Sequence, residues 1–151
     1  MLARSPLFEG IEEQDLPALL DCLGATTRHF AKKHTVLNEG APVRHIGIVL
    51  KGRVLIVQDD VWGNRSVLGG IEPGQLFAEA FAFAKVNTLP VSIVADLDSD
   101  ILLLDHSRML RPCQNACRFH AQLIDNIMRI LAQKNLLLRQ KLEFLSQRTT
   151  R

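Results

Sequence analysis

The spacing of apolar residues changes twice along the 151-residue chain and divides it into three stretches. In the first stretch, four leucines recur at helical spacing: Leu16, Leu19, Leu20 and Leu23. Asp15 is placed to cap a helix, Pro17 is tolerated in its first turn, and Gly24 supplies a stop. The stretch up to Gly24 is therefore predicted to form short helices.

The middle stretch, from Thr26 to about Leu104, consists of short runs of strand-like composition separated by Gly, Asn, Asp or Pro. Seven runs are candidate strands: 27–30, 35–37, 45–50, 53–58, 66–71, 89–95 and 100–105. Turn signals around Gly52 and at 61–65 predict tight reversals between neighbouring strands. Many short strands at this spacing predict an antiparallel sandwich or barrel.

The last stretch contains neither Gly nor Pro from about residue 115 to 147, and its apolar residues recur every seven positions. One series is Leu123, Ile130, Leu137 and Phe144, and a second runs beside it: Ile124, Leu131, Leu138 and Leu145. A helix of roughly 30 residues is ~45 Å long, which is more than a small barrel is wide. The helix is predicted to pack on the β-region with one side and on a twin helix with the other, as a homodimer, rather than to be buried within a monomer.

Composition limits the possible functions without selecting one. Hydrophobic residues make up 47% of the chain and charged residues 23%, as in a globular domain with a core of its own. The formal net charge of +2 is too small to indicate nucleic-acid binding by itself. The N-terminus has no long apolar core and no segment approaches the ~20 apolar residues of a membrane helix, so neither a signal peptide nor a membrane partner is expected. Three cysteines form no dense framework, which favours a reduced, cytoplasmic protein.

Several short motifs follow one another along the chain. SPLF at 5–8 precedes the leucine-rich segment, EG stands at 39–40, VLKGRV at 49–54 and PGQLFAE at 73–79, and the long helix comes last. In this order and spacing they resemble the sensor domain of the Crp/Fnr family of transcription regulators over essentially the whole chain. The resemblance implies a mainly β fold: a double-stranded β-helix, or jelly roll, of the cyclic-nucleotide-binding type, with short N-terminal helices and a long C-terminal dimerisation helix.

The resemblance also implies a division of the chain. A β-roll effector-sensing domain is expected at 1–114, a dimerisation helix at 115–147 and a hinge at 148–151. The residues expected at the dimer interface are Leu123, Ile127, Ile130, Leu131, Leu137, Leu138 and Phe144. In the family, the effector repositions a C-terminal helix-turn-helix, which this sequence lacks, so DNA is expected to be contacted only through that missing domain. The chain is accordingly expected to be a fragment, with a natural stand-alone sensor as the alternative.

The identity of the effector depends on two positions. Family members that bind cyclic nucleotides use a Gly-Glu pair, whose Glu takes the ribose hydroxyl, and a later Arg-Ser pair, whose Arg binds the phosphate. Aligned on Glu79, the Gly is replaced by Ala78, and Leu89-Pro90 stands at the Arg-Ser position. A buried phosphate without the Arg fork is poorly compensated, so the expected effector is a small, less anionic molecule of unknown identity. The residues predicted to line its site are Phe77, Ala78, Glu79, Phe81, Phe83, Lys85, Leu89 and Pro90. A capping or structural role is the alternative for Glu79.

Other chemistry is weaker. Cys113, Cys117 and His120 lie at helical spacing and suit a metal or haem site, but plain core residues are the alternative because no fourth ligand is evident. A cupin-like metal-dependent enzyme is a second hypothesis, although the sequence contains no His-x-His pair. A ligand-free dimerisation scaffold is the third. The sequence thus favours a regulator that is not an enzyme and needs no cofactor.

Overall fold

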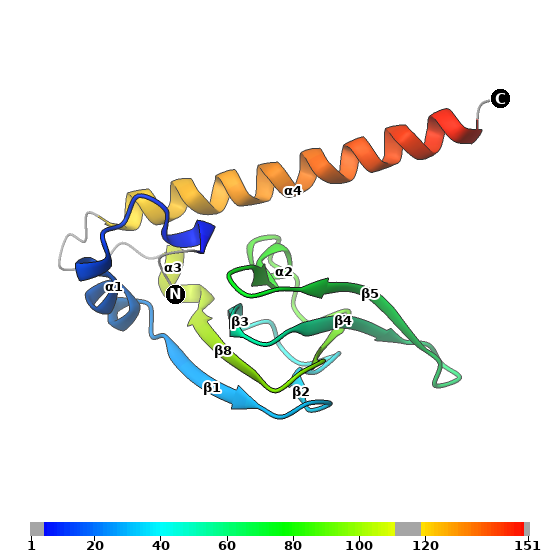
Figure 1. Cartoon of the computed structure of the whole chain (residues 1–151), viewed down its shortest axis with the longest axis horizontal. Coiled ribbons are helices and arrows are strands. Elements are labelled where there is room, and N and C mark those ends of the chain that lie inside the picture. Colours follow the sequence, from blue (N-terminus) through cyan, green and yellow to red (C-terminus); the bar gives the residue numbers. More distant parts are fainter. Residues whose placement is uncertain (1–4, 111–118, 150–151) are drawn as a thin grey trace.

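Two four-stranded antiparallel sheets face each other, and one long helix runs across them (Figure 1). This computed structural model describes residues 5–110 and 119–149. One sheet has the order β1-β8-β3-β6 and the other the order β2-β7-β4-β5. The strands are β1 (Thr26–Phe30), β2 (Thr35–Leu37), β3 (His45–Lys51), β4 (Val54–Asp59), β5 (Arg65–Ile71), β6 (Leu76–Phe77), β7 (Ser92–Ala95) and β8 (Ser99–Asp105). The predicted mainly β fold is confirmed.

Each of the seven predicted runs contains a strand, and the two-residue β6 was missed. The run predicted at 89–95 becomes a strand only from Ser92 onward, after Pro90, which has no N–H to give to a ladder. The tight reversal predicted at Gly52 lies between β3 and β4, but these two strands belong to different sheets and do not pair with each other. Gly52 (φ +91°) turns the corner against Ser99, where any side chain would collide with the backbone of Asp98. The reversal predicted at 61–65 is confirmed as the β4–β5 hairpin.

The helices are η2 (Pro6–Phe8), η3 (Glu13–Asp15), α1 (Leu16–Cys22), α2 (Glu79–Phe83), α3 (His106–Leu110) and α4 (Phe119–Thr149). Leu16, Leu19 and Leu23 are buried, as their spacing predicted. Gly24 (φ +65°) ends α1: its N–H donates to Asp21 O, and the next N–H, of Ala25, donates to Leu20 O. The expected Asp15 cap is wrong, because its side chain makes no capping hydrogen bond and its backbone is already helical at the end of η3.

The core has two parts because β3 and β8 of the first sheet are buried on both faces. Along β8, Ile101 and Leu103 point between the sheets, whereas Leu102 and Leu104 point toward the helices. This alternation follows from the two-residue period of a strand. We call the space between the sheets the roll interior; its fully buried side chains include Val49, Val54, Phe77, Ile93 and Ile101. The helix-side core contains the N-terminal helices and the first half of α4.

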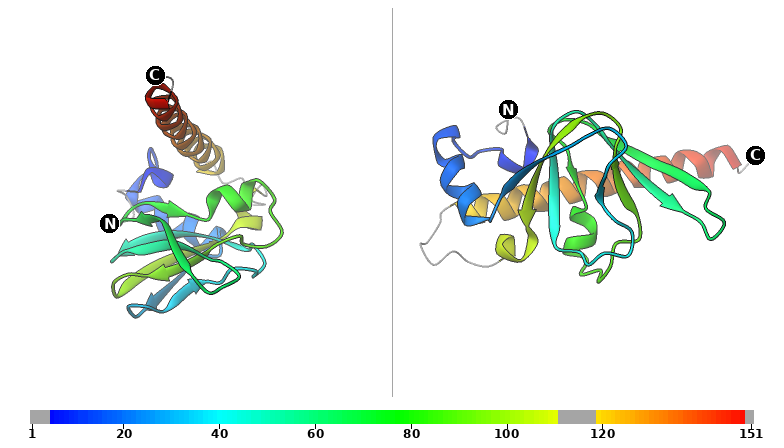
Figure 2. Two further views of the ribbon diagram at one scale, coloured as in Figure 1. Left: turned by 90° about the vertical axis from the view of Figure 1, so that its right-hand side faces the viewer. Right: turned by 90° about the horizontal axis from the view of Figure 1, so that it is seen from below.

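α4 crosses the roll and continues past it, as Figure 2 shows from two further directions. Leu123, Ile127 and Ile130, which were expected at a dimer interface, lie in the chain's own helix-side core at 0–6% exposure. Leu131 packs partly against that core, while Leu137 and Leu138 are more than half exposed. The side chain of Phe144 lies outside the described residues. Every residue from 132 to 143 is exposed. No described helix is long and apolar enough to cross a membrane.

Candidate effector site and its link to α4

Aromatic side chains fill part of the roll interior. Phe77 is 1% exposed, and its ring covers Gly47 on the neighbouring strand β3, where even a methyl group would overlap it. Phe81, in α2, packs against the same cluster from its edge. Ala78 lies between them in the left-handed region at φ 67° and is buried. The structure thus brings three of the predicted effector residues, Phe77, Ala78 and Phe81, to the roll interior.

Glu79, the first residue of α2, turns toward α4 instead. Its side chain is only 6% exposed and forms an ion pair with the ammonium group of Lys134, halfway along α4. The same ammonium lies 3.5 Å from the carbonyl oxygen of Leu76. The carboxylate that takes a ribose hydroxyl in the resemblance is therefore already neutralised by the chain's own helix.

The position expected for a phosphate-binding Arg-Ser pair has no donor to offer. Leu89 is 3% exposed, its N–H donates to Ala41 O, and its carbonyl accepts from Gly40 N. Pro90 has no N–H, and its carbonyl accepts from the Gln58 side chain at 3.3 Å. Both backbone groups of Leu89 are therefore bonded to the segment between β2 and β3, and neither the Leu89 nor the Pro90 side chain can donate a hydrogen bond. A phosphate at this position would have no charge-assisted partner from these two residues.

Phe83 and Lys85 lie apart from the roll interior. Phe83 packs on the helix-side core and meets the His106 ring edge-on, with the centroids 5.5 Å apart. Lys85 is exposed and adopts φ 58° just after α2. Its N–H donates to Ala82 O, and the following N–H, of Val86, donates to Phe81 O, which is the hydrogen-bond pattern of a helix C-terminus usually built with glycine.

A groove of about 350 Å³ separates the edge of the roll from α4. Residues on both sides line it, among them Gly70, Ile71, Gln75, Ile130, Gln133 and Lys134. Sequence reasoning missed Lys134, although a signal was present. Lys134 occupies the next position of the buried series Leu123, Ile127 and Ile130. A single charged residue on an otherwise apolar helix face indicates a buried partner of opposite charge.

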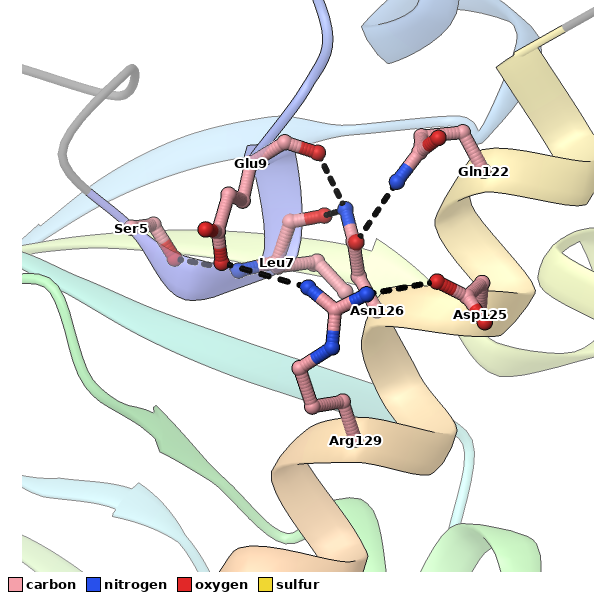
Figure 3. Close-up of polar contacts among 7 residues, drawn as sticks. All are labelled: Ser5, Leu7, Glu9, Gln122, Asp125, Asn126 and Arg129. Carbon is pink, nitrogen blue, oxygen red and sulfur yellow. Dashed lines mark hydrogen bonds and ion pairs between the residues drawn. The ribbon is translucent and has the colours of Figure 1, made fainter.

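A second polar contact fixes the N-terminal segment to α4 (Figure 3). Asn126 is 1% exposed, and its side-chain NH₂ donates to the carbonyl oxygens of Leu7 and Glu9, both at 2.8 Å. The Gln122 amide donates to Asn126 Oδ1 at 2.9 Å. Arg129, one turn further on, lies 3.5 Å from Glu9 and 2.8 Å from Asp125 at the surface. Asn126 and Lys134 are thus two polar anchors that join α4 to the rest of the chain.

A polar cleft of about 400 Å³ borders α3, and its lining includes His45, Asp105, His106 and Ser107. The Ser107 hydroxyl donates to Asp105 Oδ1 at 2.7 Å, and this bond is the main cause that lowers the pKa of the Asp105 carboxyl below its usual value. The Ser107 N–H donates to the same oxygen, so Asp105 caps α3.

Metal binding gains no support from the described part of the chain. Within residues 5–110 and 119–149, no three His, Cys, Asp or Glu side chains are grouped so as to hold an ion. Cys113, Cys117 and the side chain of His120, which were considered for a metal or haem, lie outside the described residues.

Comparison with known proteins agrees with this architecture. A family model described as "Cyclic nucleotide-binding domain" matches residues 27–116, which is more than half of the chain. The chain belongs to the cyclic nucleotide-binding domain family. Curated relatives described as "CRP-like cAMP-activated global transcriptional regulator", from two strains of Mycobacterium tuberculosis, are 28% identical over 108 residues. The match covers 68% of this chain, which spans about half (47%) of the length of those relatives.

Solved structures show the same fold. The catabolite activator protein of Thermus thermophilus has a TM-score of 0.75 at 22% identity, covering 94% of this chain and 63% of its own. The sensor domain of the transcriptional regulator DNR from Pseudomonas aeruginosa has a TM-score of 0.71 at 20% identity, covering 94% and 89%. The N-terminal domain of a Streptomyces coelicolor regulator has a TM-score of 0.70 at 22% identity, covering 89% and 95%. The expected jelly roll and the resemblance to Crp/Fnr sensor domains are confirmed.

Proposed function

We propose that this cyclic nucleotide-binding-family domain is the effector-sensing and dimerisation part of a Crp/Fnr-like transcription regulator in the cytoplasm. Residues 1–114 would sense the effector, 115–147 would pair two chains, and 148–151 would lead to a helix-turn-helix beyond this sequence. The relatives are named as transcriptional regulators, which supports a regulatory rather than an enzymatic role. DNA would be contacted through the C-terminal domain, not through the β-roll.

We infer that the effector is a small apolar or weakly polar molecule rather than a cyclic nucleotide. Two observations carry this inference: Glu79 is paired with Lys134, and the Leu89-Pro90 segment has no free hydrogen-bond donor. A cyclic nucleotide would have to displace Lys134 from Glu79 and would then leave its phosphate without an arginine. The aromatic cluster around Phe77 and Phe81 instead favours an apolar ligand in the roll interior.

The proposed switch runs through α2. A ligand that repacks Phe81 would displace α2, whose first residue, Glu79, is bound to α4 through Lys134. A ligand changes the balance between two arrangements of α4 only by its difference in affinity for them. The helix pair would pass that change on to the DNA-reading domain.

Calorimetry and thermal-shift measurements test the effector class on the whole chain with cyclic AMP, cyclic GMP, a long-chain fatty acid, haem and an aromatic acid. We expect no response to the cyclic nucleotides and a rise in melting temperature with one of the apolar compounds. Phe81→Ala should abolish that rise, and Phe83→Ala is the matched control because Phe83 packs on the helix side. A shift of several degrees with cyclic AMP that Glu79→Ala removes would overturn the proposed effector class.

A ligand-free dimerisation scaffold is the second candidate, because Phe77 and Phe81 already occupy part of the roll interior. In a scaffold no compound would raise the melting temperature, and Phe81→Ala would lower stability without changing any ligand response. A cupin-like enzyme would instead carry a metal ion with at least three protein ligands after purification.

A further inference from the structure

The groove between the roll and α4 is a cavity that the proposed effector site does not use. Its volume of about 350 Å³ lies within the range of small-molecule sites. One wall comes from the end of β5 and from β6, and the other comes from α4. Of the described residues that line it, Ile71 alone also packs against the roll interior, so the groove is largely separate from that interior.

The deepest part of the groove is apolar. Leu76 and Ile130 are 2% and 6% exposed, and Ile71 is partly buried. Pro6 and Leu137 continue the apolar lining toward solvent, where both residues are exposed. An alkyl chain or a small ring placed there would remove apolar surface of both walls from water. The groove therefore suits a ligand with an apolar body.

Two glutamine side chains at the groove have hydrogen-bonding groups without a partner. The side-chain oxygen of Gln75 accepts from the N–H of Glu72 at 2.9 Å, but its NH₂ makes no hydrogen bond to any described residue. Gln133 lies opposite on α4, and its whole amide is without a hydrogen bond in the same part of the chain. The two amides together present more donors than acceptors, so a complementary ligand should carry a hydrogen-bond acceptor.

The charge of Lys134 determines that this acceptor should be neutral. The ammonium group has three N–H donors, of which Glu79 and the carbonyl oxygen of Leu76 use two. The third N–H could donate to a ligand, but the positive charge is already balanced by Glu79. A carboxylate bound to Lys134 would lie close to the buried Glu79 carboxylate and be repelled by it. A cationic headgroup would meet no acid among the described residues that line the groove.

We propose that the groove is a second ligand site, which binds a small neutral carbonyl compound with an apolar body, such as an amide, an ester or a ketone, and that Gln133 donates a hydrogen bond to its carbonyl oxygen. This ligand would contact β5, β6 and α4 at once. It would therefore favour the arrangement in which α4 lies against the roll. The proposal does not depend on which effector occupies the roll interior.

A series of headgroups tests the ligand class on the whole chain. Calorimetry near neutral pH compares octanamide, octanoate and octylammonium, which share an alkyl body and differ in the charge of the headgroup. Octanamide should bind with a dissociation constant of roughly millimolar order or tighter, as so small a molecule allows. Each charged compound should bind at least about tenfold more weakly. Absence of octanamide binding would overturn the site, and equal or tighter binding of either charged compound would overturn the neutral ligand class.

Two glutamines of α4 provide a matched pair of variants. Gln133 and Gln140 are both exposed and lie about two turns apart on the same helix, but only Gln133 lines the groove. Gln133→Ala should weaken octanamide binding by about three- to tenfold, as expected for one lost hydrogen bond. Gln140→Ala should leave the dissociation constant within about twofold of wild type. Equal affinities of the two variants would overturn the role of Gln133.

Nuclear Overhauser effects between octanamide and methyl groups of the protein locate the bound compound. Contacts with Leu76 and Ile130 would support the groove. Contacts with Ile93 instead would place octanamide in the roll interior, and contacts spread over exposed leucines such as Leu136 would show unspecific binding. Either result would overturn the second site. The proposed effector class keeps its own test with Phe81→Ala, so the two proposals can fail separately.

Discussion

The buried carboxylate of Glu79 is paired with the ammonium group of Lys134, which lies 55 residues further along the chain. The pair connects the short helix α2 to the middle of α4. Glu79 is almost fully buried, whereas the Lys134 side chain is about half exposed at 49%. When the pair is broken, the loss of stability therefore comes mainly from the carboxylate, because it is less accessible to water than the lysine is.

The single variant Lys134→Met should be less stable than the double variant Lys134→Met/Glu79→Gln, in which the buried charge is removed as well. Lys134→Met leaves a buried carboxylate without a partner and is expected to cost about 1–3 kcal/mol of unfolding free energy, less than for a fully buried pair because Lys134 is half exposed. Adding Glu79→Gln should restore part of this loss, which a double-mutant cycle by urea unfolding at fixed protein concentration measures. Arg139→Met, which breaks an exposed pair on the same helix, is the control and should cost less than about 1 kcal/mol. Equal losses of unfolding free energy in Lys134→Met and Arg139→Met would show that the buried carboxylate of Glu79 is not stabilised by Lys134.

Asn126 should be the more important of the two polar anchors for stability. Asn126→Ala leaves the carbonyl oxygens of Leu7 and Glu9 without their donor in a buried place, so we expect a loss of about 2–3 kcal/mol in urea unfolding. Arg129→Ala removes surface ion pairs of the same segment and should cost under about 1 kcal/mol. If the two variants were equally stable, the N-terminal segment would not be held by Asn126.

The contact between Gly47 and Phe77 makes a steric prediction. Gly47→Ala places a methyl group where the Phe77 ring lies and should destabilise the chain by about 1–3 kcal/mol, as overpacking of cores does. Gly69→Ala is the matched control in β5, because nothing lies within 4 Å of the added methyl group there. Phe77→Leu in the Gly47→Ala background should recover part of the loss by making room. Thermal unfolding of the four proteins measures both effects, and no recovery would mean that the strain lies elsewhere.

The local sequence pattern was sufficient to predict most of the strands. It was insufficient where contacts with distant residues determine the backbone geometry. Alternation and turn residues located seven strands because both are properties of a few neighbouring residues. β6 was missed because two residues cannot display a period. The corner at Gly52 does not join paired strands because its geometry is set by Ser99. The Ser99 hydroxyl accepts from the N–H of Arg53, 46 residues earlier in the chain, and donates to Leu97 O. Such contacts leave no trace in the local pattern.

The candidate site was predictable to a similar degree. Phe77, Ala78 and Phe81 meet in the roll interior, whereas Phe83 faces the other core because it lies two residues further along a helix. The link from Glu79 to Lys134 could not be derived from either residue alone. The charge of Lys134 within an apolar helix face indicated that some buried acid was nearby, but only the fold identified which one. The pairing of two chains through α4 stays a prediction.

Lys85 offers a prediction about backbone strain. It holds φ 58° at the end of α2, a conformation that costs a non-glycine residue roughly 1 kcal/mol. Lys85→Gly should therefore raise the unfolding free energy by about 0.5–1 kcal/mol, although glycine also gains freedom in the unfolded chain. Ala84→Gly, one residue earlier at φ −81°, is the control and should be destabilising. Urea unfolding measures the stability of both variants. A destabilised Lys85→Gly would mean that the lysine side chain stabilises the fold by more than its left-handed backbone conformation destabilises it.

The capping of α3 by Asp105 should make the stability of the fold depend on pH. The Ser107 hydroxyl is the main cause of its lowered pKa, with further contributions from the Ser107 N–H, Arg108 and His45. Because the folded pKa lies below that of the unfolded chain, this interaction stabilises the fold above about pH 4 and is lost as the pH falls through the folded pKa. Ser107→Ala should raise the pKa of Asp105 toward its ordinary value, measured by NMR titration of its carboxyl group. The melting-temperature difference between wild type and Ser107→Ala should be largest near neutral pH and shrink below about pH 4. Ser92→Ala removes a hydroxyl that accepts only from a backbone N–H in the described contacts, so its effect should not vary with pH in this window. A Ser107→Ala difference that stays constant down to about pH 2 would assign the effect to lost packing rather than to the charge of Asp105.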